Sequence, residues 1–473
     1  MNLVYKVNDR PKFFSLITFA FQQLLAILAA TIAVPAITNG VITRTDVFGE
    51  SALLMSQSAA LFGAGVGTIV YLLFTKFKSP VFLGSSFAFL GSMAAAFTGA
   101  ATAGATEALG FAGLLIGAGF AGLVYVGIAI IVRIAGIRWI RKLMPPVVIG
   151  PTVAIIGLSL AGNAIGDALH GTAKNSGGAF IMSPSGWVSF GCALVTLMVV
   201  ILCSVRGKKM MKLIPFIIGI LAGYVTAIIF TLIGNATGND ALKVINFSAF
   251  ETMKSVEDLI RVPDFTFLEG LKGFKEVNLE YIASIAVAYV PVAFVVFAEH
   301  IADHKNLSTI IGQDLLEDPG LHRTLLGDGV GSIAGAFFGG CPNTTYGESV
   351  GCVAITGNAS VITILITGIM AIAISFFTPF VTFLSTIPSC VMGGVCITLY
   401  GFIAVSGLKM LQPVDLNDNR NLFTASVILI AGIGGMAMQI GFVTLTSIAC
   451  ALILGILVNV QFTVFGKKNN QEK

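Results

Sequence analysis

The sequence predicts an all-α membrane protein with fourteen transmembrane segments, arranged as two inverted repeats of seven. The composition, the number of apolar stretches and one long polar connection predict this fold. Hydrophobic residues make up 56% of the 473 residues and charged residues only 11%, which is unlike a soluble domain. Apolar stretches of about twenty residues, each able to cross a hydrocarbon core of roughly 30 Å as a helix, recur throughout the chain.

Fourteen apolar segments follow one another along the chain. The charged N-terminal stretch leads into the first of them without a small-residue cleavage site, so we expect no removable signal peptide. The segments lie near 13–38, 51–75, 80–98, 108–132, 145–165, 187–205, 213–234, 281–301, 323–340, 342–355, 359–386, 388–406, 421–439 and 441–465.

The basic residues indicate the orientation of these segments. Alternate connections, beginning with the N-terminal tail and ending with the C-terminal tail, carry most of the 27 Lys and Arg residues. Because cytoplasmic connections are enriched in basic residues, both termini are predicted to be cytoplasmic in a protein of the cell membrane. The polar connection 235–280 is then extracytoplasmic and divides the segments into seven and seven. Repeats of an odd number of spans have opposite orientations, which is typical of secondary transporters.

The third segment of each half is interrupted. Residues 79–89 read SPVFLGSSFAF and residues 341–349 read CPNTTYGES. Each has a polar or extended start followed by a helix too short for a full crossing, so we predict short extended stretches and half-helices in segments 3 and 10. A helix start offers unpaired N–H groups and partial positive charge, and such backbone is tolerated in a membrane only where it is buried or lines a cavity.

Four acidic residues lie in or at the ends of apolar segments: Glu299, Asp303, Asp328 and Glu348. An ionisable residue at bilayer depth costs about 2.5 to 3.5 kcal/mol on the insertion scale, so such residues usually have a function. Glu299 and Asp303 are four residues apart and therefore share one helix face. No Lys or Arg of a central segment neutralises these acids, which makes all four candidates for proton coupling.

Other classes of site have weaker support. The seven cysteines are odd in number and lack CxxC spacing, so we interpret them as buried packing residues. The composition gives no indication of nucleic-acid binding. His300 and His304 are four residues apart, as in some metal sites, but EHIADH lacks the HExxH order of a metalloprotease. A channel that conducts cations through rings of acids is a further alternative.

Four motifs resemble the nucleobase-ascorbate transporter family, specifically its uracil permease branch. They are GSSFAF (84–89), AEH (298–300), DLLEDPGLHR (314–323) and NTTYGES (343–349). The resemblance covers nearly the whole chain. It implies proton-coupled import of a nucleobase, most often uracil, without an enzyme activity, a cofactor or a metal. It also implies a core domain (1–140 and 281–386), a gate domain (141–234 and 387–466), and pairing of two copies through the gate domains.

The resemblance also assigns a substrate site. Glu299 and Glu348 would accept hydrogen bonds from ring N–H groups at different edges of uracil, and the backbone N–H groups of Phe87 and Gly347 would donate to its carbonyl oxygens. Ala30, Tyr346 and the ring of Phe87 would pack around the base. The chemistry agrees, because uracil carries two N–H donors and two carbonyl acceptors and so requires carboxylates beside helix-start donors.

Three features leave the substrate and some roles open. Asp303 stands where the uracil branch commonly has histidine, and together with Asp328 it is closer to the purine branch. The branch for xanthine or urate usually has glutamine at the position of Glu348, so a purine remains the alternative substrate. The usual Gln-His pair of the first segment is Gln22-Gln23 here.

Roles in structure alone are the alternative for these residues. Glu299, Glu348 and Asp328 could be structural, and Asp303 could lie at a solvated helix end. Tyr400 is a further candidate for the gate side of the site.

Overall fold

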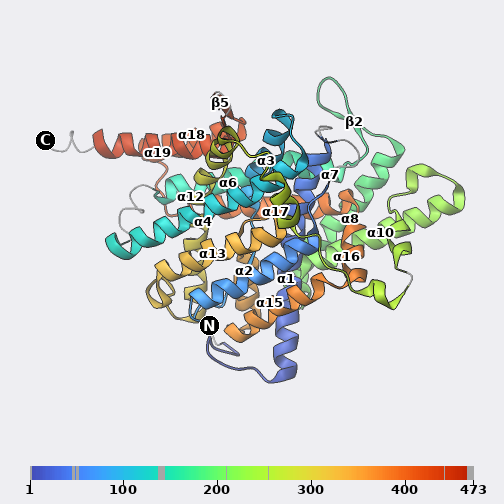
Figure 1. Ribbon diagram of the computed structural model, residues 1–473, viewed down its shortest axis with the longest axis horizontal. Coiled ribbons are helices and arrows are strands. Elements are labelled where there is room, and N and C mark those ends of the chain that lie inside the picture. Colours follow the sequence, from blue (N-terminus) through green and yellow to red (C-terminus); the bar gives the residue numbers. More distant parts are fainter. Residues whose placement is uncertain are drawn as a thin grey trace.

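The computed structural model describes residues 3–44, 48, 53–136, 144–208, 210–253, 255–440 and 443–465. Helices dominate, with three small two-stranded sheets (Figure 1). Within these ranges, eight helices are long and apolar enough to cross a membrane, and four shorter apolar helices accompany them. The predicted helical membrane protein is therefore confirmed, whereas the number of fourteen spans stays a prediction. The basic C-terminal tail after 465 lies outside the described residues.

The elements of the first half follow the apolar segments. They are α1 (Phe13–Arg44), α2 (Gln57–Phe74), β1 (Leu83–Ser85), the 3-10 helix η1 (Phe87–Phe89), α3 (Leu90–Thr102), α4 (Glu107–Ala135), α6 (Pro146–Ser159), α7 (Ala161–Ala168), β2 (Ala173–Lys174), β3 (Phe180–Ile181), α8 (Pro184–Arg206), α9 (Met210–Leu213) and α10 (Pro215–Thr237).

The polar connection and the second half contain the remaining elements. They are η2 (Asp240–Leu242), η3 (Phe247–Thr252), η4 (Val256–Leu259), α11 (Thr266–Gly273), α12 (Leu279–Ile311), η5 (Leu316–Gly320), α13 (Leu321–Gly339), β4 (Asn343–Thr345), α14 (Gly347–Thr356), α15 (Val361–Ser375), α16 (Thr378–Ser385), α17 (Ser389–Lys409), α18 (Asn419–Ile433), β5 (Met438–Ile440), β6 (Val443–Leu445) and α19 (Ser447–Phe465).

Some predicted boundaries are wrong. Hydropathy placed the end of the eighth segment at 301, but α12 continues to Ile311 and ends at Gly312, which adopts the left-handed conformation with φ 71°. Hydropathy falls before the helix ends, because its last turns carry polar residues: His304 is buried against Tyr71, whereas Lys305 and Asn306 are exposed. The segment 145–165 consists of α6 and α7, separated at Leu160, and the segment 359–386 consists of α15 and α16.

Strands β1 and β4, which are far apart in the sequence, pair antiparallel with Leu83 opposite Thr345 and Ser85 opposite Asn343. Both are fully buried, so their outer polar groups need partners inside the protein. Thr68 on α2 supplies some of them: its hydroxyl accepts from the Leu83 N–H at 2.9 Å and donates to the Leu83 carbonyl at 3.2 Å. The Asn343 amide donates to the Gly63 carbonyl. The strand pair is thereby held against α2, and each strand leads into a helix.

The helices pack in two groups. In one, α13 lies against α2 and α4, with α1 and α15 beside α2. The same group includes α3 and α12 beside α4, α14 beside α1 and α12, and α16 beside α2 and α15. Close approach depends on glycines, because a Cβ at Gly63 on α2 would lie 2.3 Å from the Gly335 carbonyl oxygen on α13. In the other, α17 lies against α6, α7 and α8, and α8 packs on α10. In Figure 1, α8 and α10 lie at the right and α4 at the left, with α17 between them.

Candidate functional site

A cavity of about 370 Å³ lies where the strand pair, α12 and α14 meet α6, α10 and α17. Its carboxylates come from α12 and α14, whereas α6, α10 and α17 contribute mainly apolar side chains. The lining residues are Ala26, Ser86, Phe87, Ala88, Val153, Ile156, Lys212, Leu213, Pro215, Phe216, Glu299, Ala302, Asp303, Thr344, Thr345, Tyr346, Gly347, Glu348, Gly351, Cys352, Ile355, Leu399, Phe402, Ile403, Ser406 and Met410.

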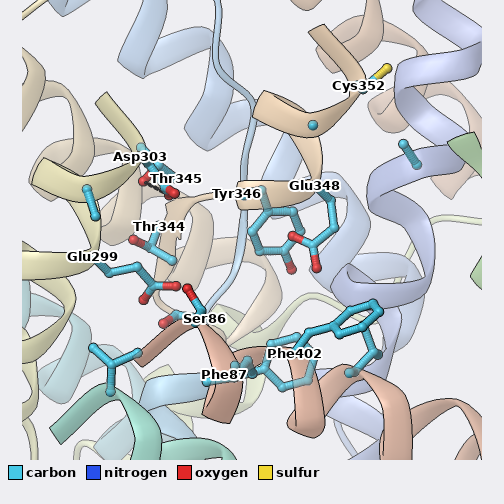
Figure 2. A pocket seen from close by; sticks show the side chains of 18 of the residues that line it. Ser86, Phe87, Glu299, Asp303, Thr344, Thr345, Tyr346, Glu348, Cys352 and Phe402 are labelled. Atoms are coloured by element: carbon cyan, nitrogen blue, oxygen red, sulfur yellow. Dashed lines mark hydrogen bonds between the residues drawn. The ribbon is translucent and has the colours of Figure 1, made fainter. Parts of the chain in front are cut away.

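Three of the four predicted acids line this cavity. Glu299 and Asp303 enter it from one face of α12, as their spacing predicts, and Glu348 enters it from the start of α14 (Figure 2). The Asp303 carboxylate accepts a hydrogen bond of 2.8 Å from the Thr345 hydroxyl. Since α12 continues well beyond this residue, the interpretation of Asp303 as a solvated helix end is wrong.

Glu348 lies in the first turn of α14, which begins at Gly347, and Tyr346 separates this helix from β4. The backbone N–H groups of such a turn have no partner within their own helix and carry partial positive charge. The next residue, Ser349, fixes this turn: its hydroxyl accepts from the Phe82 N–H at 3.0 Å and from the side-chain amide of Gln23 on α1. From the sequence, Gln23 was named only as a departure from the family pattern and was assigned no role, although an amide in an apolar segment was the available signal.

Aromatic rings form much of the remaining surroundings. Phe87 lines the cavity and meets Tyr400 edge to face, with ring centroids 6.0 Å apart. Phe216 and Phe402 form a similar pair, also at 6.0 Å. The hydroxyl of Tyr346 donates to the Ser85 carbonyl at 2.8 Å, which turns its ring across the strand pair. The pocket therefore offers flat apolar surfaces beside its carboxylates.

Asp328 and Ala30 lie behind the lining. Asp328 on α13 is fully buried, and its Oδ2 lies 2.7 Å from Nδ1 of His300. His300 also contacts the Thr324 hydroxyl at 3.0 Å. Ala30 is buried in a cluster that includes Tyr346, but it is absent from the lining as far as the described residues define it.

The two histidines do not converge on a common point. His304 Nε2 contacts the Tyr71 hydroxyl at 2.6 Å, and its Nδ1 contacts the His300 carbonyl at 2.8 Å. The rings stack with centroids 4.0 Å apart. Within the described ranges, no group of three or more His, Cys, Asp or Glu side chains could hold a metal ion. All seven cysteines are buried and unpaired, as the sequence predicts.

Comparison with known proteins identifies the family of the chain. The model of a family described as "Permease family" matches residues 14–441. The chain belongs to this permease family. Members of it are transporters, so the permease is a transporter rather than an enzyme.

Relatives resemble the permease over nearly its whole length. The uracil permease of Bacillus caldolyticus is 39% identical over 462 residues, covering 96% of this chain and 94% of its own. The uracil permease of Bacillus subtilis is 36% identical, with coverages of 96% and 94%. That of Escherichia coli K12 is 32% identical, with coverages of 98% and 95%.

Two solved structures share the fold at low sequence identity. The transmembrane domain of the cyanobacterial bicarbonate transporter BicA superposes with a TM-score of 0.58 at 16% identity, covering 95% of this chain and 98% of its own. The murine anion transporter Slc26a9 in its inward-facing state gives a TM-score of 0.64 at 10% identity, with coverages of 97% and 69%. At these identities the similarity establishes the fold alone.

Proposed function

We propose that the permease is a proton-coupled symporter that imports uracil across the cell membrane by alternating access. The observation that carries this proposal is that two carboxylates line one cavity: Glu299 enters it from α12, and Glu348 enters it from the start of α14. Neither carboxylate has a Lys or Arg among its hydrogen-bond partners in the described chain, which favours a neutral ligand with N–H donors. The uracil permeases among the relatives support the same substrate.

In the proposed complex each polar atom of uracil has a partner in the pocket. The carboxylates accept from its two ring N–H groups, and the backbone N–H groups of Phe87 and Gly347 donate to its carbonyl oxygens. The rings of Phe87 and Tyr346 provide apolar surface for the flat base, with Ala30 packed behind Tyr346. In this arrangement η1 and α3 together form the half-helix of segment 3. The half-helix of segment 10 is α14.

The two helix groups correspond in this proposal to a core domain (1–140 and 281–386) and a gate domain (141–234 and 387–466), within fourteen spans. The substrate cavity lies between them. Its lining includes Lys212, Ser406 and Met410, beside connections rich in basic residues. By the positive-inside rule these lie at the cytoplasmic side, with both termini. We infer that the cavity is reached from the cytoplasmic side in this state, and that a rocking motion would open it outward.

The coupled proton neutralises a carboxylate during this motion. We assign it to Glu299 or Asp303, one turn apart on α12, with Glu348 and Asp328 as further members of the coupling set. Neutralisation removes the cost of enclosing an unpaired charge when the cavity closes. Pairing of two copies through the gate domains belongs to the same proposal, and light scattering of the detergent-solubilised protein tests it.

Uptake into proteoliposomes tests the function. An acid exterior should drive accumulation of labelled uracil above its external concentration, and a protonophore should abolish accumulation. Unlabelled uracil should compete at lower concentration than xanthine, urate or cytosine. Stronger competition by xanthine would assign the purine alternative, and uptake indifferent to the protonophore would remove proton coupling. Uptake that does not saturate would indicate a channel.

A further inference from the structure

Residues 4–9, the N-terminal strap, are bound to the end of α14 that is remote from its carboxylate. Tyr5 forms a parallel β-bridge with Asn358. The Tyr5 N–H donates at 3.2 Å to the carbonyl of Gly357, the residue that caps α14, and the Ala359 N–H donates to the Tyr5 carbonyl at 2.9 Å. The strap therefore pairs with the chain directly after α14, much as an added strand would.

Further contacts follow along the strap. The Ser360 hydroxyl donates to the Asp9 carbonyl at 2.7 Å, and the Val361 N–H donates to the Val7 carbonyl at 3.1 Å. The Val7 side chain is buried, in the same apolar cluster as Val350 of α14. Backbone bonds, a side-chain bond and apolar packing thus act together to hold the strap in place.

The strap also lies beside the end of α12. A separate cavity of about 680 Å³ is lined by Lys6 and Asp9 of the strap and by Ile311 and Gly312 at the end of α12. Helices α12 and α14 carry the carboxylates that line the substrate cavity. The strap therefore stands at the far ends of both of these helices.

The opposite side of α14 faces the second helix group. Cys352 of α14 forms a small apolar cluster with Ala26 of α1 and Leu213 of α9. In the proposed mechanism α9 moves with the gate domain, whereas α14 must stay with α12 so that the carboxylates keep their spacing. A helix of ten residues is a short, stiff rod. The contacts of Ser349 hold its first turn, and the strap holds its last.

We propose that Val7 and Ser360 are positioning residues for the substrate site, which hold the far end of α14 in the core domain and so set the place of Glu348. This inference rests on the proposed function. Neither side chain lines the substrate cavity, so both act through the tilt of α14. When the two domains rock, the strap keeps α14 with α12 and prevents it from following α9.

Uracil affinity is the first readout. It is measured by calorimetry for the wild type, Val7→Ser and Ser360→Ala, with Ser360→Thr as the conservative rescue. Thr367→Val is the matched control. The Thr367 hydroxyl also joins the two halves of the chain, since it donates to the Ala20 carbonyl at 3.2 Å, but it lies on α15 and not beside α14.

The reactivity of single cysteines with a maleimide is the second readout, and it needs no substrate. Cys352 lies on α14 one turn after Glu348, whereas Cys341 precedes β4, and the two residues are only 4% and 1% exposed. Proteins that retain one of these cysteines are labelled in detergent. Movement of α14 alone exposes Cys352, whereas general destabilisation exposes both.

Val7→Ser and Ser360→Ala should each bind uracil about three- to tenfold more weakly than the wild type. Both should also speed the labelling of Cys352 without speeding that of Cys341. Ser360→Thr and Thr367→Val should resemble the wild type in both readouts.

Wild-type uracil affinity in both variants, or equal acceleration at Cys352 and Cys341, would overturn the positioning role and leave the proposed function intact. Absence of uracil binding in the folded wild type would instead overturn the proposed function. The labelling of Cys352 would then still decide whether the strap holds α14.

Discussion

His300 on α12 and Asp328 on α13 are joined by a buried hydrogen bond of 2.7 Å, and neither side chain is exposed. His300 directly follows Glu299. Successive residues of a helix point about 100° apart, so the bond that holds His300 against α13 also sets the direction in which Glu299 enters the cavity. Asp328 thus acts on the site through the rotation of α12, without lining the cavity itself.

Replacement of Asp328 separates this positioning role from a charge role. Asp328→Ala leaves the His300 ring nitrogen unpaired and should lower stability by about 1 to 3 kcal/mol, with weaker uracil binding. Asp328→Asn keeps an acceptor oxygen and should retain most of both. Thermal unfolding and calorimetry measure these effects. If Asp328 takes part in proton coupling, Asp328→Asn will still bind uracil but its uptake will respond differently to pH. If Asp328→Asn destabilised the protein as much as Asp328→Ala in thermal unfolding, this would contradict a positioning role of the hydrogen bond.

A Cβ at Gly84 would lie 2.3 Å from the ring of Tyr346. Gly84→Ala should therefore displace Tyr346 or separate β1 from β4, and uracil binding should fall at least about tenfold. Gly91→Ala is the control, since a Cβ there meets no atom within 4 Å. It should bind uracil like the wild type, because alanine suits a helix better than glycine. Normal uracil affinity in Gly84→Ala would show that displacement of Tyr346, or separation of β1 from β4, does not affect the substrate site.

The sequence predicted the acids and the interrupted segments because both violate the rule that membrane segments are apolar and continuous. Glu299 and Asp303 followed from helical spacing alone. Asp328 could not be placed, since its partner His300 belongs to another helix and no local pattern records that pairing. The contact of Gln23 with Ser349 could not be predicted for the same reason: polar side chains are common in membrane helices, and only the packing shows their partners. The end of α12 was misplaced because hydropathy detects only the apolar part of a helix, whereas α12 continues through polar residues, some buried (His304) and some exposed (Lys305).

Tyr224 on α10 joins the two helix groups on the side away from Lys212. Its hydroxyl lies 2.8 Å from that of Thr386, and its ring meets Phe383 at 5.0 Å. A second cavity, of about 540 Å³, is lined by Thr386 and Cys390. In the proposed mechanism this contact closes the outer side and must break when the cavity opens outward.

Tyr224→Phe should favour the outward-open state, because it removes the hydrogen bond and keeps the ring. A protein retaining only Cys390 should then react several-fold faster with a membrane-impermeant maleimide added outside. Tyr281→Phe is the control: Tyr281 donates to the Ala96 and Leu109 carbonyls within one helix group, so its loss should affect stability but not labelling. Equal labelling rates in both variants would exclude Tyr224 as an outer contact.

Glu348 provides the most direct test of the substrate site. Glu348→Gln replaces an acceptor oxygen by an amide that also donates, so one ring N–H of uracil loses its charged partner. Hydrogen bonds to charged groups contribute about 1.5 to 3 kcal/mol, which corresponds to a loss in uracil affinity of roughly 10- to 150-fold. Glu280→Gln is the matched control, because Glu280 also occupies the first turn of a helix but is exposed on α12 and away from the cavity. Calorimetry should show the loss in Glu348→Gln alone. The same variant should shift competition toward bases that present an acceptor at this edge, since the amide can donate to them. Wild-type uracil affinity in Glu348→Gln would mean that the base binds elsewhere in the cavity.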